Sequence, residues 1–109
     1  MDEDDPVVTE LDGDFEAQPW QWDARRSDGW IFVSLPEELS DDLRLAAGEP
    51  RGFGSVRVGV RLGGSAWETS VFPDKERGVF VLPLKKAVRV AEGVEVGEPV
   101  RVAVRLLRG

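Results

Sequence analysis

Hydrophobic and polar residues alternate along two short segments of the chain. Residues 56–62 read Val-Arg-Val-Gly-Val-Arg-Leu, and residues 100–106 read Val-Arg-Val-Ala-Val-Arg-Leu. Successive side chains of a strand point to opposite faces, so this alternation predicts two half-buried strands. Each strand would turn valine and leucine toward a core and arginine toward the opposite face.

Four further segments have the composition of strands. Residues 15–22, 30–35, 65–72 and 79–82 are rich in aromatic and branched residues and are separated by turn residues. Pro19 predicts an edge or bulged strand, because proline donates no hydrogen bond to a sheet. Gly63-Gly64 predicts a tight hairpin between two of the strands.

Two segments place hydrophobic residues at helical spacing. Leu35, Leu39 and Leu43 predict a first helix, and Ser34 with Glu37 matches a capping box at its start. The second predicted helix spans residues 83–92, with an apolar face of Leu84, Ala87, Val88 and Ala91.

The predicted elements form the order ββαβ twice. A spacing of 49 residues relates Gly29 to Gly78, and a spacing of 44 relates Arg57 to Arg101. Residues 51–55 account for the difference as one insertion. The two Leu-Pro pairs, at 35–36 and 82–83, lie two residues off the 49-residue frame, so the duplication requires a compensating gap in the helix. Chance similarity of valine-rich strands is the alternative to an internal duplication.

These elements predict a mainly β fold of a single domain. We expect a single-chain double-split β-barrel, in which two ββαβ pseudo-repeats share one barrel and two short helices flank it. The barrel domain would span residues 14–109, after an acidic flexible tail at residues 1–13. Trp30 and Trp67 lie within strand patterns and are predicted to be core residues.

The composition excludes several kinds of chemistry. The chain has no histidine, cysteine or tyrosine, which rules out Ser-His-Asp and Cys-His sites and any metal site with nitrogen or sulfur side-chain ligands. We therefore predict no metal, no cofactor and no enzymatic activity. Paired carboxylates leave a carboxylate-based hydrolase as a remote alternative.

The absence of cysteine, of a signal peptide and of a membrane-length apolar run predicts a cytoplasmic protein that does not bind membranes.

The charge is distributed unevenly along the chain. Residues 1–50 hold 15 acidic and 3 basic side chains, whereas residues 51–109 hold 6 acidic and 11 basic ones, and the net charge is −7. The basic half contains a candidate nucleic-acid surface that comprises Arg57, Arg61, Lys85, Lys86, Arg89, Arg101 and Arg105. The favoured interpretation is a solvated sheet face with cross-strand ion pairs, since the acidic total opposes non-specific binding to nucleic acid.

Two tryptophans form a second candidate surface. Trp20 and Trp22 share one face of the first predicted strand, and together they would mark a ligand or partner site if both are exposed. The alternative is that they cover an open end of the barrel.

Five motifs together resemble a bacterial family known as domain of unknown function 1905. They are Gly29-Trp30 with Phe32-Val33-x-Leu35-Pro36, Gly-Phe-Gly-Ser-Val-Arg-Val at 52–58, Trp-x-Thr-Ser-Val-Phe-Pro at 67–73, Val-Leu-Pro-Leu-Lys-Lys-Ala-Val-Arg at 81–89, and Gly97-Glu98-x-Val100-x-Val102. The resemblance covers residues 15–107, and Gly97-Glu98 departs from the Gly-Asp that is usual in the family.

This resemblance implies a split β-barrel related to the swapped-hairpin transition-state regulators, in which two chains each supply one half. It also implies an association with a bacteriocin-protection module, but no activity. Together, the residues and the resemblance predict a monomeric, non-enzymatic binding module whose partner is an unknown protein or small-molecule ligand. A DNA-binding regulator that carries both barrel halves in one chain is the alternative.

Overall fold

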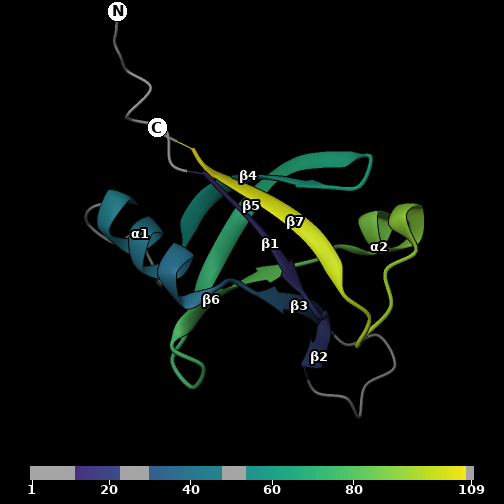
Figure 1. Ribbon diagram of the computed structural model, residues 1–109, viewed down its shortest axis with the longest axis horizontal. Coiled ribbons are helices and arrows are strands. Elements are labelled where there is room, and N and C mark those ends of the chain that lie inside the picture. Colours follow the sequence, from purple (N-terminus) through teal and green to yellow (C-terminus); the bar gives the residue numbers. More distant parts are fainter. Residues whose placement is uncertain (1–11, 23–29, 48–53, 108–109) are drawn as a thin grey trace, which may run out of the picture.

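The computed structural model describes residues 12–22, 30–47 and 54–107 of the chain. In this part, seven strands and two helices follow one another (Figure 1). They are β1 (Asp12–Ala17), β2 (Trp20–Trp22), β3 (Trp30–Ser34), α1 (Glu37–Ala47), β4 (Val56–Leu62), β5 (Ser65–Asp74), β6 (Val79–Pro83), α2 (Lys86–Glu92) and β7 (Val100–Leu106).

The strands form one antiparallel sheet in the order β1-β7-β4-β5-β6-β3-β2. The first and last strands of this order, β1 and β2, are separated along the chain only by Gln18 and Pro19. The two ends of the sheet therefore lie close together, and the sheet curls into a barrel-like shape (Figure 1). The predicted mainly β fold with two short helices is confirmed.

Two strand segments change partner at the bends of the sheet. In β5, Val71 pairs with Val56 of β4, but the next residue, Phe72, pairs with Val81 of β6. The segment predicted as one interrupted strand is likewise divided at Pro19, since β1 pairs with β7 and β2 pairs with β3. One half of the sheet thus consists of β1, β7, β4 and the start of β5, and the other of the end of β5, β6, β3 and β2.

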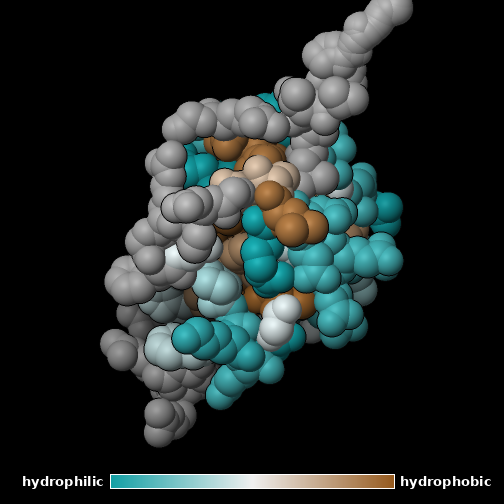
Figure 2. All heavy atoms as spheres, turned by 90° about the vertical axis from the view of Figure 1, so that its left-hand side faces the viewer, coloured by the Kyte–Doolittle hydropathy of each residue, from teal (hydrophilic) through white to brown (hydrophobic). Residues whose placement is uncertain are grey.

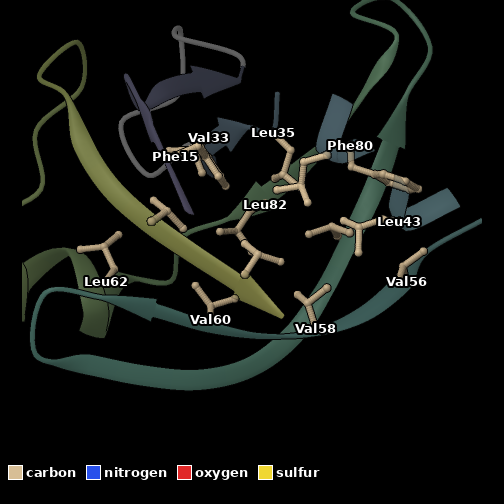
Figure 3. Packing of buried hydrophobic residues seen from close by; sticks show 14 of the residues in the cluster. Phe15, Val33, Leu35, Leu43, Val56, Val58, Val60, Leu62, Phe80 and Leu82 are labelled. Atoms are coloured by element: carbon tan, nitrogen blue, oxygen red, sulfur yellow. The ribbon is translucent and has the colours of Figure 1, made fainter. Parts of the chain in front are cut away.

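The core lies on the concave side of the sheet (Figure 3). The apolar residues of the two alternating strands are buried there, as predicted, except Val100, which is half-buried; the buried ones are Val56, Val58, Val60 and Leu62 of β4 and Val102, Val104 and Leu106 of β7. The arginines between them are exposed. The alternating pattern thus determines which face of each strand is buried.

Helix α1 closes part of the core with Leu39 and Leu43. The predicted capping box is wrong, because the helix begins at Glu37 and Ser34 belongs to β3. The Ser34 hydroxyl instead accepts a hydrogen bond of 3.0 Å from the Trp20 indole N–H. Ser40 is fully buried, and its hydroxyl accepts a hydrogen bond of 3.0 Å from the Phe80 backbone N–H, which fixes the helix to β6.

The outer side of α1 is not entirely polar. Leu45 exposes 81% of its surface. On the side of the molecule where α1 lies, Figure 2 shows hydrophobic residues in the middle of the surface, with hydrophilic ones to the right of and below them. Neither helix of the described residues is long and apolar enough to cross a membrane.

Helix α2 is shorter than predicted and is attached by both apolar and polar contacts. Of its predicted apolar face, Leu84 and Val88 are buried, whereas Ala87 and Ala91 are exposed. Its last residue, Glu92, accepts hydrogen bonds from the Ser65 hydroxyl at 2.6 Å and from the Gly64 N–H at 3.2 Å. Seven residues cannot provide a long apolar stripe, so Glu92 secures the helix to the β4–β5 hairpin.

Candidate functional site

An aromatic groove runs over the convex side of the second half of the sheet. It has a volume of about 510 Å³ and is lined by Trp20, Trp22, Trp30, Phe32, Phe72, Pro73, Asp74, Lys75, Glu76, Arg77, Val81 and Pro83. These residues come from β2, β3, β6, the end of β5 and the β5–β6 turn. We call this surface the aromatic groove.

Strand register gathers the aromatic rings on one face. Trp20 pairs with Phe32, and Trp22 pairs with Trp30, so all four side chains project to the same side of the sheet. The Trp20 and Phe32 rings stack with centroids 5.1 Å apart, and those of Trp30 and Phe32 with centroids 6.3 Å apart. The rings of Trp20, Phe32 and Trp30 form a continuous row, and Trp22 leaves 58% of its surface exposed on the same face.

The prediction that Trp30 is a core residue is wrong. Trp30 is 63% exposed, whereas its neighbours Ile31 and Val33 are buried. Nearly every residue of β3 is apolar, so the sequence pattern does not distinguish the inner face from the outer one. Trp67, the other tryptophan assigned to the core, is half-buried and packs against it.

Sequence reasoning identified Trp20 and Trp22 but missed the rest of the groove. Phe72 is 39% exposed because it points to the face of β5 opposite to the buried Val71, and it pairs with β6 rather than with β4. Arg77 also went unnoticed, since its role depends on a turn that folds back over β2. A run of apolar residues in β3 without alternation is the one signal in the sequence that both faces are apolar.

The guanidinium group of Arg77 already lies over the face of one ring of the groove, that of Trp20. The central carbon of the Arg77 guanidinium lies 3.7 Å from the centroid of the Trp20 ring, a cation–π contact. Arg77 also forms an ion pair of 2.8 Å with Asp74. Burial raises the pKa of Asp74, but hydrogen bonds from the Arg77 side chain and from the backbone N–H groups of Arg77 and Glu76 outweigh burial and hold the pKa below its ordinary value.

The four predicted strand arginines lie together on the convex side of the first half of the sheet. In the pairing of β4 with β7, Gly59 faces Arg105 and Arg61 faces Ala103. Acidic residues flank the arginines on both sides, with Asp12, Asp14 and Glu16 on β1 and Glu68 on β5. We call this surface, formed by the outward side chains of β1, β7, β4 and the start of β5, the charged face.

Two of the four arginines are neutralised by these carboxylates. Arg57 forms an ion pair with Glu68 at 3.8 Å, and Arg101 forms one with Asp14 at 2.7 Å. The arginines thus share one surface, as a DNA-binding site requires, but they alternate with acidic residues, as a solvated sheet face does. The ion pairs favour the interpretation of this surface as a solvated sheet face.

The three basic candidates of the second helix make separate contacts. The Lys85 ammonium lies 6.0 Å from the centroid of the Trp67 ring, and the Arg89 Nε donates a 3.0 Å hydrogen bond to the Leu84 carbonyl. Lys86 is exposed at the start of α2. No hydrogen bond or ion pair in the described part of the chain joins these residues to the strand arginines. Across the same ranges, no three acidic side chains gather in a group that could hold a metal ion.

Comparison with known proteins identifies one family. The family model described as "Domain of unknown function (DUF1905)" matches residues 15–104. This range begins within β1, ends within β7 and contains every described element between them. No curated protein matches the sequence. Since the match covers most of the chain, the chain belongs to the DUF1905 family.

Proposed function

We propose that this chain is a non-enzymatic binding module whose aromatic groove takes a basic peptide segment of a partner protein. The observation that carries the proposal is the Arg77 guanidinium on the Trp20 ring, which is the type of contact that an incoming arginine would make with the exposed rings. Trp22 and Trp30, at 58% and 63% exposure, are the rings available to it.

The charge of the chain supports a basic partner. The net charge of −7 attracts cations and repels the phosphates of nucleic acid, so base stacking is the less favourable use of these rings. The exposed aromatic surface is also of the kind that marks interaction sites.

The chemistry of the groove favours binding over catalysis. The sequence contains no histidine, cysteine or tyrosine. Asp74, a carboxylate in the groove, is held ionised by Arg77, which makes it a poor proton donor near neutral pH.

Titration with blocked peptides, followed by tryptophan fluorescence, tests the proposal. We expect acetyl-Gly-Arg-Leu-Arg-Gly-amide to bind and the matched peptide with glutamate in place of arginine not to bind. Trp22→Ala and Trp30→Ala should each weaken binding roughly tenfold, given the usual strength of a partly desolvated cation–π contact. Val90→Ala is the control, because Val90 is 72% exposed on α2, outside the groove.

Three outcomes would contradict this function. They are equal binding of the acidic peptide, unchanged affinity in both tryptophan variants, or tighter binding of a single-stranded oligothymidine than of the basic peptide. The last outcome would indicate a base-stacking site.

We further propose that the two ββαβ halves are related by a pseudo-two-fold axis, which makes the chain a double-split barrel. Val60 faces Val104 in one central pairing, and Val33 faces Leu82 in the other. These partners are separated by 44 and 49 residues, the two spacings of the sequence repeat.

Equivalent polar contacts support the same axis. The Leu35 N–H donates to the Phe80 carbonyl at 2.9 Å, and the Leu84 N–H donates to the Ile31 carbonyl at 2.8 Å. Both partners of the second bond are related to those of the first by a spacing of 49 residues. Leu35 thus corresponds to Leu84 rather than to Leu82, and the two Leu-Pro pairs are not equivalent. The ion pairs Arg57–Glu68 and Arg101–Asp14 also correspond.

A further inference from the structure

A hollow on the charged face lies between two arginines. It has a volume of about 390 Å³ and includes three small residues, Gly59, Ala66 and Ala103, together with Arg61 and Arg105. Strand register places Arg61 opposite Ala103 and Arg105 opposite Gly59, so the two arginines are diagonal neighbours on adjacent strands. Diagonal neighbours lie about 7–8 Å apart, within reach of long side chains.

These inner arginines differ from the outer two in their partners. Arg57 and Arg101 form ion pairs with Glu68 and Asp14. Over the ranges that the structure describes, Arg61 and Arg105 form none. Asp12 faces Arg105 across the pairing of β1 with β7 but forms no ion pair with it. Two neighbouring guanidinium groups that form no ion pair repel each other, and one bound carboxylate could satisfy both.

The Arg105 side chain covers part of the floor of the hollow. A Cβ atom on Gly59 would lie 3.8 Å from Arg105 Nη2 and 4.0 Å from its Nε, so the Arg105 side chain crosses directly over the glycine. Ala66 and Ala103 keep the rest of the floor low, because their side chains are short. A ligand can therefore lie beside the Arg105 guanidinium, over these small residues.

Carboxylates at the rim of the hollow place negative charges beside the positive charges of the arginines. Asp12 and Glu68 line it together with the arginines, and Glu68 faces Gly59 on the side opposite to Arg105. The Cα atoms of Arg105 and Glu68 are two strand spacings apart, about 10 Å, and the Arg105 guanidinium leans over Gly59 toward Glu68. The gap between the charged groups is therefore shorter than about 10 Å, which suits a ligand of dipeptide length, at most about 7 Å.

We propose that this hollow binds a small zwitterion of dipeptide size, with its carboxylate on Arg61 and Arg105 and its ammonium group on Glu68. This site is separate from the aromatic groove and does not depend on the function proposed for it. The charges of the hollow, two positive and two negative, match a zwitterion better than a simple anion such as phosphate.

Titration of the full chain with three probes, followed by the amide resonances of Gly59 and Ala103, tests this site. We expect Ala-Ala to bind, and both acetyl-Ala-Ala and Ala-Ala-amide to bind roughly tenfold more weakly, because each lacks one charge-assisted contact. Arg61→Gln and Arg105→Gln should lower the affinity for Ala-Ala by a similar factor. Glu68→Gln should remove the preference for Ala-Ala over acetyl-Ala-Ala.

Arg57→Gln is the matched control on the same strand. Because Arg57 is paired with Glu68, its loss frees this carboxylate, and Ala-Ala should bind equally well or more tightly. The proposal is overturned if Arg57→Gln weakens binding as much as Arg61→Gln does, or if acetyl-Ala-Ala or inorganic phosphate binds as tightly as Ala-Ala. It is also overturned if duplex DNA binds with equal dependence on all four arginines, which would indicate a nucleic-acid surface.

Discussion

Leu43 and Leu45 place the same side chain in opposite environments within one helix. Leu43 is 1% exposed and belongs to the core, whereas Leu45 is 81% exposed. Helical geometry separates them, since positions four apart share a face and positions two apart do not. The contribution of a leucine to stability therefore depends on its position along α1.

Leu43→Ala should lower the free energy of unfolding by about 2–5 kcal/mol, because it removes buried methylene groups and leaves a cavity. Leu45→Ala should change it by less than about 0.5 kcal/mol, as expected for an exposed position. Urea unfolding of the two variants, followed by circular dichroism, measures both values. Similar losses in the two variants would contradict the placement of α1 against the sheet.

At the scale of elements, polar contacts of Glu92 help to hold α2 against the β4–β5 hairpin, beside the buried Val88. The hydrogen bonds from the Ser65 hydroxyl and the Gly64 N–H both lower the pKa of Glu92 below its ordinary value of 4.5. A carboxylate with a lowered pKa in the folded state stabilises the fold at pH above its pKa in the unfolded chain. That contribution is lost as the pH falls through the lower pKa of the folded state.

An NMR pH titration tests this attachment of α2. The Gly64 amide resonance should move with a midpoint below 4.5 as Glu92 is protonated and its hydrogen bonds weaken. Glu92→Gln should abolish this transition and speed hydrogen exchange in α2 at neutral pH. Glu95→Gln is the control, since Glu95 is exposed just beyond the helix. A Gly64 transition that persists in Glu92→Gln would contradict the contact.

At the scale of the whole molecule, strands from the first half of the chain, before the Gly63-Gly64 turn, pair with strands from the second half. Four of the six strand pairings join an element before the Gly63-Gly64 turn to one after it, namely β1 with β7, β4 with β5, β4 with β7 and β3 with β6. Neither half can satisfy its own strand edges or build a core of adequate size.

Cutting the chain between Gly63 and Gly64 should therefore give two fragments that are unfolded alone and fold when mixed. Circular dichroism of fragments 1–63 and 64–109, separately and in equimolar mixture, measures this behaviour. A first fragment with Leu43→Ala should reassemble more weakly than the unaltered one. A fragment that folds cooperatively on its own would contradict the interleaved arrangement.

Much of the fold could be predicted from local patterns, and much of the candidate site could not. Val58 and Val102 were assigned to the core because charged and small residues alternate with valine around them, and both are fully buried. Trp30 was misassigned because β3 is apolar on both faces. Phe72 joins the aromatic groove because the pairing of β5 changes from β4 to β6 just before it, which local patterns do not reveal.

The sequence by itself determined the type and order of the elements, except that one predicted strand divides into β1 and β2. It also determined the buried face of each alternating strand and the absence of histidine, cysteine and tyrosine chemistry. These properties depend on residues that are close together in the chain. The tertiary structure alone decided that the rings of Trp20, Trp22, Trp30 and Phe32 share one face. It also decided that, among the described residues, Arg57 and Arg101 are ion-paired while Arg61 and Arg105 are not. Those properties depend on strand register and on the curl of the sheet, which bring together residues that are distant in sequence.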